Sequence, residues 1–199
     1  YDEARTSFRS AEKIDPDFVL AYWGEAMTYN HPLWGEQDYK QAVIALAHLA
    51  PTALQRAEKA KTAREKGLIN AVNILFGKGS KATRDSHYVD AMRELYRANP
   101  NDEEIALLYS LALLGSAESE RDARVYMQAA GVAEDVYLTH KLHPGALHYA
   151  IHAYDDPIHA PLGLRAARAY AAVAPSSSHA LHMPSHIFAA LGMWDDVIK

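Results

Sequence analysis

Residues 1–26 read YDEARTSFRSAEKIDPDFVLAYWGEA, and their apolar spacing decides the fold. Apolar side chains recur every three or four positions, as on one face of an α-helix: Tyr1, Ala4, Phe8 and Ala11. Pro16 ends this run, and a second begins with Ala21, Tyr22 and Ala26. Small side chains let two antiparallel helices approach closely, while a large side chain opposite fills the gap. The stretch therefore predicts a pair of antiparallel helices.

The same punctuation returns at the other end of the chain. Residues 179–199, HALHMPSHIFAALGMWDDVIK, contain a Leu191-Gly192 stop followed by Trp194, as where one helix closes and its partner begins. Pro175 ends the alanine-rich run LGLRAARAYAAVA, and residues 99–102, NPND, interrupt the middle of the chain in the same way.

Helical periodicity covers nearly the whole chain, and no alternating stretch predicts a strand. The expected helices lie near residues 2–14, 17–30, 37–49, 53–61, 63–77, 85–98, 102–115, 119–138, 145–155, 160–173, 178–191 and from 194 onward. The segment GKGSKATRDS, residues 77–86, is predicted to be a polar loop. Pro184 predicts that a helix either begins or kinks there, because proline lacks a backbone N–H.

These spacings resemble the tetratricopeptide repeat (TPR) family, whose period is 34 residues. Three blocks, AYWGEAMTYNHPLW, HPGALHYAIHAYDDP and HALHMPSHIF, are similar to a group of bacterial TPR proteins. The resemblance implies an all-α, right-handed solenoid of antiparallel helix pairs, forming one domain over residues 1–199. In that register the chain starts on a second helix and stops just after a first helix, so we expect that at least one flanking helix is missing.

Composition narrows the classes of partner and compartment. Against 20 basic side chains stand 25 acidic ones, which gives a net charge of −5 and no electrostatic reason to expect a nucleic acid or a membrane as partner. The chain has no cysteine, so disulfides and thiolate metal sites are excluded. Both the cytoplasm and the periplasm are compatible with a cysteine-free, soluble chain, and the localisation stays open.

Histidines supply the main functional signal. His148 and His152 are four residues apart and would share one helix face, and His182 and His186 repeat this spacing. The second pair follows the first at an offset of 34 residues, which is the TPR period. The two pairs therefore occupy equivalent positions on the first helices of adjacent repeats.

The TPR resemblance implies that these positions face the concave groove of a solenoid. The same register adds further candidates for that groove: His179, Asp155, Asp156, His31, Trp23 and Asn30. Trp23 has a plainer interpretation as a core residue, and His179 as a residue of a helix cap.

Neighbouring helices about 8–10 Å apart allow facing imidazoles to share one metal ion. We therefore predict a divalent transition metal bound by His148, His152, His182 and His186, with zinc or copper ahead of iron. An acid–base pair of His152 and Asp155 would allow catalysis, although the sequence does not decide whether the protein is an enzyme.

Two other functions remain open. The groove could bind a peptide or a partner helix, as other TPR modules do, or the array could be purely structural. Peptide-binding TPR grooves usually present lysine, arginine and asparagine, whereas the inferred groove presents histidine and aspartate, which favours the metal.

Overall fold

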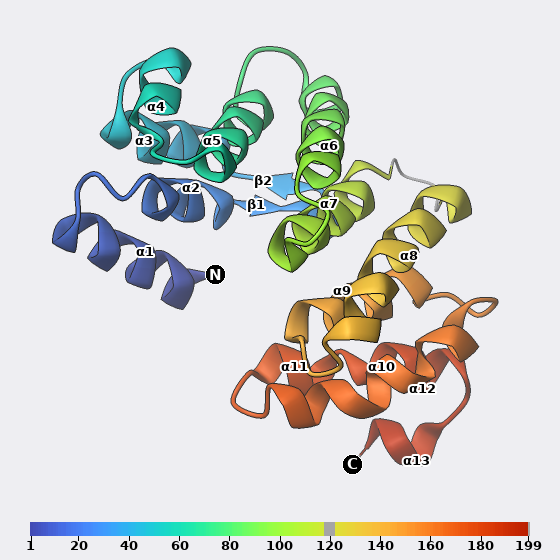
Figure 1. Cartoon of the computed structure of the whole chain (residues 1–199). Helices are drawn as coiled ribbons and strands as arrows, with labels where there is room; N and C mark the ends of the chain where they lie inside the picture. The colour runs from blue at the N-terminus through green and yellow to red at the C-terminus, as the bar shows by residue number, and fades with distance from the viewer. Residues whose placement is uncertain (118–121, 199) are drawn as a thin grey trace. The chain divides into compact units, whose positions relative to one another are not determined.

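Helices make up nearly all regular structure in residues 1–117 and 122–198, which the computed structural model describes (Figure 1). The expectation of an all-α chain is confirmed. In this part of the chain the strands are limited to β1 (Asn30–His31) and β2 (Glu36–Gln37), which pair in antiparallel fashion. The chain divides into two compact units, residues 1–99 and 100–199, each with its own packing.

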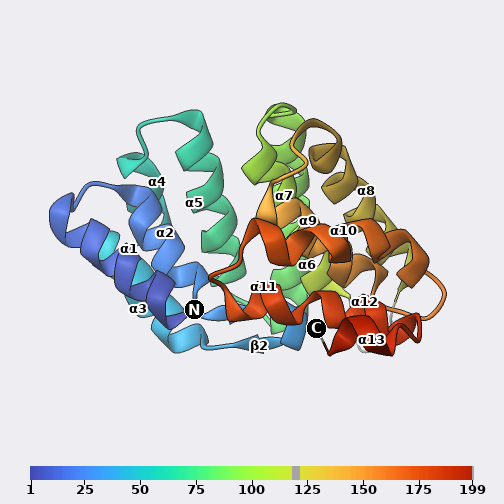
Figure 2. The ribbon, with the colours of Figure 1, turned by 90° about the horizontal axis from the view of Figure 1, so that it is seen from below.

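The first unit is built around its second helix. Its helices are α1 (Asp2–Ile14), α2 (Val19–Met27), the short 3-10 helix η1 (Pro32–Trp34), α3 (Tyr39–Leu49), α4 (Ala53–Lys59), α5 (Ala63–Leu75) and α6 (Lys81–Ala98). Helix α2 packs against α1, α3 and α5 (Figure 2). A buried apolar cluster joins α2, α3, α4 and α5: Val19, Tyr22, Leu49, Ala57 and Ile69.

The pairing of α1 with α2 follows the predicted small-against-large pattern. A Cβ atom at Gly24 would lie 2.2–2.5 Å from ring atoms of Phe8, so only glycine lets the Phe8 ring rest on the α2 backbone. The pair predicted from residues 1–26 therefore forms through direct contact of its smallest and one of its largest residues.

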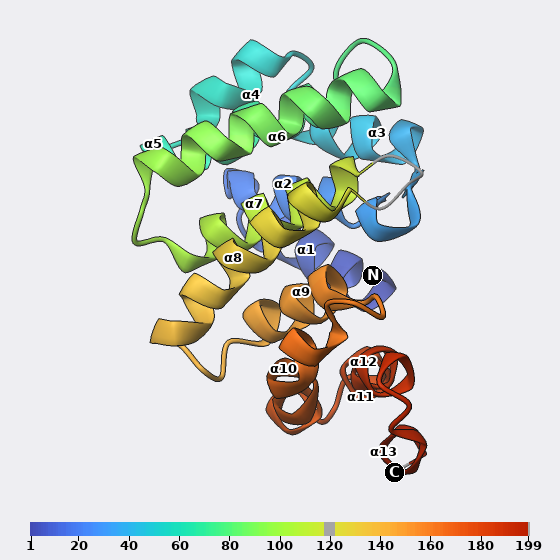
Figure 3. The same ribbon diagram turned by 90° about the vertical axis from the view of Figure 1, so that its right-hand side faces the viewer.

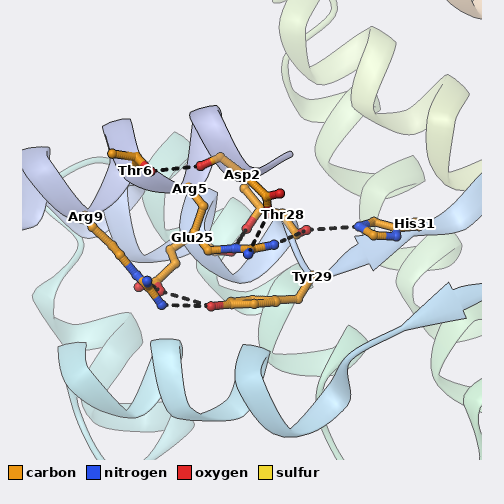
Figure 4. Close-up of polar contacts among 8 residues, drawn as sticks. All are labelled: Asp2, Arg5, Thr6, Arg9, Glu25, Thr28, Tyr29 and His31. Atoms are coloured by element: carbon orange, nitrogen blue, oxygen red, sulfur yellow. Dashed lines mark hydrogen bonds and ion pairs between the residues drawn. The ribbon is translucent and has the colours of Figure 1, made fainter. Parts of the chain in front are cut away.

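A buried acidic group is satisfied within this pair of helices (Figure 4). Glu25 is 2% exposed, and its Oε1 accepts hydrogen bonds from Arg9 Nε at 2.7 Å and from the Tyr29 hydroxyl at 3.4 Å. Arg9 also donates to the Tyr29 hydroxyl at 2.9 Å. Burial and the neighbouring charge of Glu25 raise the pKa of Glu12 to about 7. The buried charge of Glu25 thus has its counter-ion within the unit.

The second unit is a succession of helices, each packed on its neighbours in sequence. They are α7 (Glu103–Ser116), α8 (Ala123–Thr139), α9 (Pro144–Tyr154), α10 (Ala160–Val173), α11 (Ser178–His182), α12 (Pro184–Ala190) and α13 (Trp194–Val197). Helix α8 packs on α7 and α9, and α10 packs on α9, α11 and α12. Figure 3 views α10, α11 and α12 nearly end-on.

Gly163 allows close packing of α9, α10 and α12. A Cβ atom there would lie 2.7 Å from Ile187 Cδ1 on α12 and 3.1 Å from Tyr154 Cβ on α9. Because glycine fills this position on α10, α9 and α12 can both approach it, and this approach brings their polar residues near one another.

Side-chain caps explain where many helices begin, and one of them corrects a predicted loop. Ser80 accepts a hydrogen bond from the Thr83 backbone N–H, so α6 starts at Lys81, inside the segment 77–86 that was predicted to be a loop. The β1–β2 ladder was also not expected, because two-residue strands have no detectable alternation. The predicted start of α8 at residue 119 lies outside the described residues.

Candidate metal centre

Three helices of the second unit carry the four histidines predicted to bind metal and His179, a further candidate for the groove. His148 and His152 lie on α9, His179 and His182 on α11, and His186 on α12. Helix α9 begins at Pro144, and proline suits this position because a backbone N–H in the first turn has no acceptor within the helix. The His143 side chain caps the helix by accepting a hydrogen bond from the Gly145 backbone N–H. Helix α11 begins after Ser177, whose hydroxyl accepts from Ala180 N–H.

The predicted helix 178–191 is divided at Met183 into α11 and α12, as Pro184 suggested. Met183 keeps right-handed helical angles, with φ −56° and ψ −37°, and its side chain is fully buried. The chain therefore continues in a helical direction through the break. His182 and His186, on opposite sides of it, still meet with their Nε2 atoms 3.0 Å apart.

Three imidazoles converge most closely, and we call them the inner trio: His148, His152 and His179. His148 Nε2 lies 3.0 Å from His152 Nε2 and 2.9 Å from His179 Nε2. All three ligand nitrogens lie within 4.8 Å of one another. Nitrogen ligands of a tetrahedral zinc ion are about 3.3 Å apart, given zinc–nitrogen distances of about 2.0–2.1 Å. The spacing of the inner trio is thus close to that of a metal site.

The Nε2 atom of His148 lies at hydrogen-bonding distance from two other rings at once. Each Nε2 of a neutral imidazole either donates one proton or offers one lone pair. His148 Nε2 faces two other Nε2 atoms at hydrogen-bonding distance, so it cannot make two full-strength hydrogen bonds at once. A cation at the centre would instead accept a lone pair from every ring.

The surroundings lower the pKa values of His148 and His179, which favours their neutral forms. Burial, followed by the nearby charge of His179, lowers the pKa of His148 to about 4. Burial, followed by the charges of His182 and His186, lowers the pKa of His179 as well. The Tyr170 ring stacks on His148 at a centroid distance of 5.4 Å and helps to enclose it. Neutral imidazoles at neutral pH are the form that binds metal ions.

The remaining two histidines form a second group, which we call the outer pair: His182 and His186. Asp155 follows α9 directly, and its Oδ2 lies 2.8 Å from His186 Nδ1. A carboxylate in this position fixes the proton of the ring on Nδ1 and leaves the Nε2 lone pair available. His182 is exposed, whereas His186 is partly buried.

The other predicted groove residues have different partners. Asp156 accepts from the backbone N–H groups of Ile158 and His159 at 2.8 and 2.9 Å, so it organises the turn that leads into α10. Trp23, Asn30 and His31 belong to the first unit. There Trp23 packs against the apolar cluster, Asn30 Oδ1 accepts from Gln37, and His31 stacks on Tyr1.

From the sequence, His179 has a lower priority than His148 and His152, the two residues beside which it lies in the structure. His179, His182 and His186 follow the spacing i, i+3, i+7, which is the spacing of one helix face and was available in the sequence. It is a groove candidate that also has an interpretation as a cap residue, and Ser177 provides the cap of this helix. Ser177 and His179 are two residues apart, so this segment contains both the cap and a member of the inner trio.

Chemically, three imidazoles suit zinc, copper or iron, and they leave a fourth tetrahedral position open. A zinc ion with three histidine ligands and one water is the donor set of catalytic rather than structural zinc sites, and it lowers the pKa of the bound water to about 7. The inner trio could therefore hold an ion that exchanges one ligand.

Comparison of the chain with protein-family models, with curated proteins and with solved structures gives no match. Among the helices of residues 1–117 and 122–198, none has the length and apolar character needed to span a membrane.

Proposed function

We propose that this chain is a metal-binding protein of the helical-repeat type, which holds one divalent transition metal ion on the inner trio. The observation that carries the proposal is the convergence of three histidine nitrogens within 4.8 Å of one another. His148 would be the central ligand, with His152 from the same helix and His179 from α11. A water molecule would complete the coordination.

Zinc and copper fit this donor set better than a harder ion. The inner trio offers only imidazole nitrogens, which suit zinc, copper, nickel and iron, whereas magnesium and calcium prefer oxygen ligands. The carboxylate of Asp155 contacts His186 of the neighbouring pair. We therefore place zinc or copper ahead of iron.

Two observations support a TPR-type arrangement of the scaffold. Helices α7 to α10 pack on one another in sequence order, as the helices of a solenoid do. The histidine pairs on α9 and on α11 and α12 are offset by 34 residues, and they lie close together. On this proposal, the metal site joins the first helices of two adjacent repeats.

Zinc titration of the metal-free protein tests the function. At a free zinc concentration 100 times the dissociation constant, a site absent from the unfolded state stabilises the fold by about 2.7 kcal/mol. For a unit of this size, the melting temperature should rise by roughly 10 °C or more. Calorimetric titration and thermal unfolding with zinc, and then with chelator, measure both effects.

His148→Ala and His179→Ala should each remove zinc binding and the thermal shift. His140→Ala is the matched control, because His140 is an exposed histidine of the same unit that pairs with Glu103. A melting temperature that zinc leaves unchanged in the wild-type protein would contradict the proposal. The histidine-lined surface should then be tested as a peptide-binding site.

A further inference from the structure

The outer pair has the geometry of ligands but has no part in the site proposed above. The Nε2 atoms of His182 and His186 lie 3.0 Å apart, nearly the same separation as between His148 and its two neighbours in the inner trio. The two residues are four apart in sequence, on either side of Met183. Their Nε2 atoms therefore meet across the break between α11 and α12.

Asp155 distinguishes the outer pair from an accidental contact between histidines. Its Oδ2 lies 2.8 Å from His186 Nδ1, and it reaches this ring from the end of α9, 31 residues earlier in the chain. Histidines that bind metal ions almost always donate their other ring N–H to a carboxylate, a carbonyl or a water, which orients the ring and makes it a better ligand. His186 has this arrangement.

The outer pair lies directly beside the inner trio. The His186 ring is 6.4 Å from the His152 ring, and the His182 ring is 6.5 Å from the His179 ring, measured between centroids. Each ring of the outer pair thus neighbours a different member of the inner trio. An ion on the outer pair would be next to an ion on the inner trio.

We propose that the outer pair binds a second divalent transition metal ion, so that the five histidines form a two-ion centre. This inference rests on the proposed function of the inner trio. The second ion should bind more weakly than the first, because only two protein nitrogens hold it, His182 is exposed, and a neighbouring cation repels it. Water molecules would complete its coordination.

The stoichiometry of zinc binding tests the proposal. Equilibrium dialysis of the metal-free, full-length chain against zinc, followed by elemental analysis, should give two equivalents at saturation. His182→Ala should give one equivalent with the affinity of the tighter site retained. Asp155→Asn should keep two equivalents and weaken the second by about 10–100-fold. His140→Ala should behave as the wild type.

Each other result has a definite meaning. One wild-type equivalent that His148→Ala removes and His182→Ala leaves would overturn the second ion and keep the proposed function. One equivalent that needs both His148 and His182 would also overturn it, because the five histidines would then share a single ion. If the wild type binds no zinc, both proposals fail.

Copper(II) provides a readout that a purely structural role of His182 would not change. Two copper(II) ions in neighbouring positions broaden each other's electron paramagnetic resonance signal through dipolar coupling. The wild type loaded with two equivalents should show this broadening, and His182→Ala should show an uncoupled signal. An uncoupled wild-type signal at two equivalents would place the second ion elsewhere and overturn the inference. Circular dichroism of each variant confirms that its helices are retained.

Discussion

In the first unit, a buried carboxylate meets its donors within the protein, whereas in the second unit the imidazole nitrogens of the inner trio meet one another. Glu25 Oε1 accepts from Arg9 and from Tyr29, so opposite charges and complementary hydrogen-bonding groups are matched. His148 Nε2 faces two atoms of its own kind. The Glu25 oxygen is thus paired with donors, whereas His148 Nε2 is shared between two rings of the same kind.

This difference in hydrogen-bond partners distinguishes polar groups with a structural role from candidate binding groups. A buried polar network that is satisfied by its own members specifies the packing of a fold. In the inner trio, His148 Nε2 faces two other imidazole nitrogens, and a bound cation would take a lone pair from each ring. We therefore assign a structural role to the network of Glu25 and propose a binding role for the histidines.

The largest effect should appear when zinc is added to the intact chain. Hydrogen exchange should slow in peptides from α9, α11 and α12, with opening free energies up to about 2.7 kcal/mol higher at 100 times the dissociation constant. Peptides from α2 and α5 of the first unit should not change, because their polar groups need no ion. Equal protection of both units, measured by mass spectrometry, would remove the distinction drawn between them.

Arg9→Met should have the converse effect. The substitution leaves Glu25 buried at 2% exposure without its cation, which should destabilise the first unit by about 2 kcal/mol. This value is below the range for fully buried ion pairs, because the Arg9 side chain is itself 53% exposed. Urea unfolding measures the loss. Calorimetry should give a zinc affinity equal to that of the wild type, and a weakened affinity would contradict independent roles.

The smallest effect should come from Glu12→Gln. The pKa of Glu12 is raised to about 7 in the folded chain, first by burial and then by the charge of Glu25, against an ordinary value of 4.5. A raised pKa contributes stability that is full below about pH 4.5 and is lost as the pH rises through about 7. As the pH rises from 5 to 8, the free energy of unfolding of the wild type should therefore fall relative to that of Glu12→Gln. Both proteins are measured in the presence of a chelator.

Solvent screens a partly exposed carboxyl, so the difference should stay below about 1 kcal/mol. Chemical denaturation of both proteins at the two pH values measures it. A difference of the opposite sign would show that Glu12 is ionised more easily in the folded state than in the unfolded chain.

Most helix positions could be predicted from the apolar periodicity and from the proline and glycine residues between helices, because both signals are local in the sequence. Helices α1 and α10 have the predicted bounds, because Pro16 and Pro175 follow their ends in the sequence. The start of α6 was wrong because its segment is polar, and a polar run does not show whether Ser80 caps a helix or lies in a loop. Strands β1 and β2 have two residues each, which is too few to show the alternation of apolar and polar residues that predicts a strand.

For the candidate site, the sequence predicted the helix faces but not the partners. The 34-residue offset grouped His148 and His152 with His182 and His186, and the structure brings these residues together. Asp155 and Asp156 could not be told apart in this way, because both follow α9 directly; in the structure Asp155 contacts His186, and Asp156 accepts a hydrogen bond from the turn before α10. Which nitrogens meet depends on side-chain torsions, which no spacing specifies.

The division of the C-terminal helix at Met183 has a consequence for the mechanics of the site. In one unbroken helix, His179, His182 and His186 would form a rigid stripe with fixed angles between their rings. Pro184 removes one backbone hydrogen bond at the junction of α11 and α12. Before this junction His179 lies against His148, and after it His186 lies against Asp155 and His182. One stripe of three histidines can thereby serve two neighbouring positions at once.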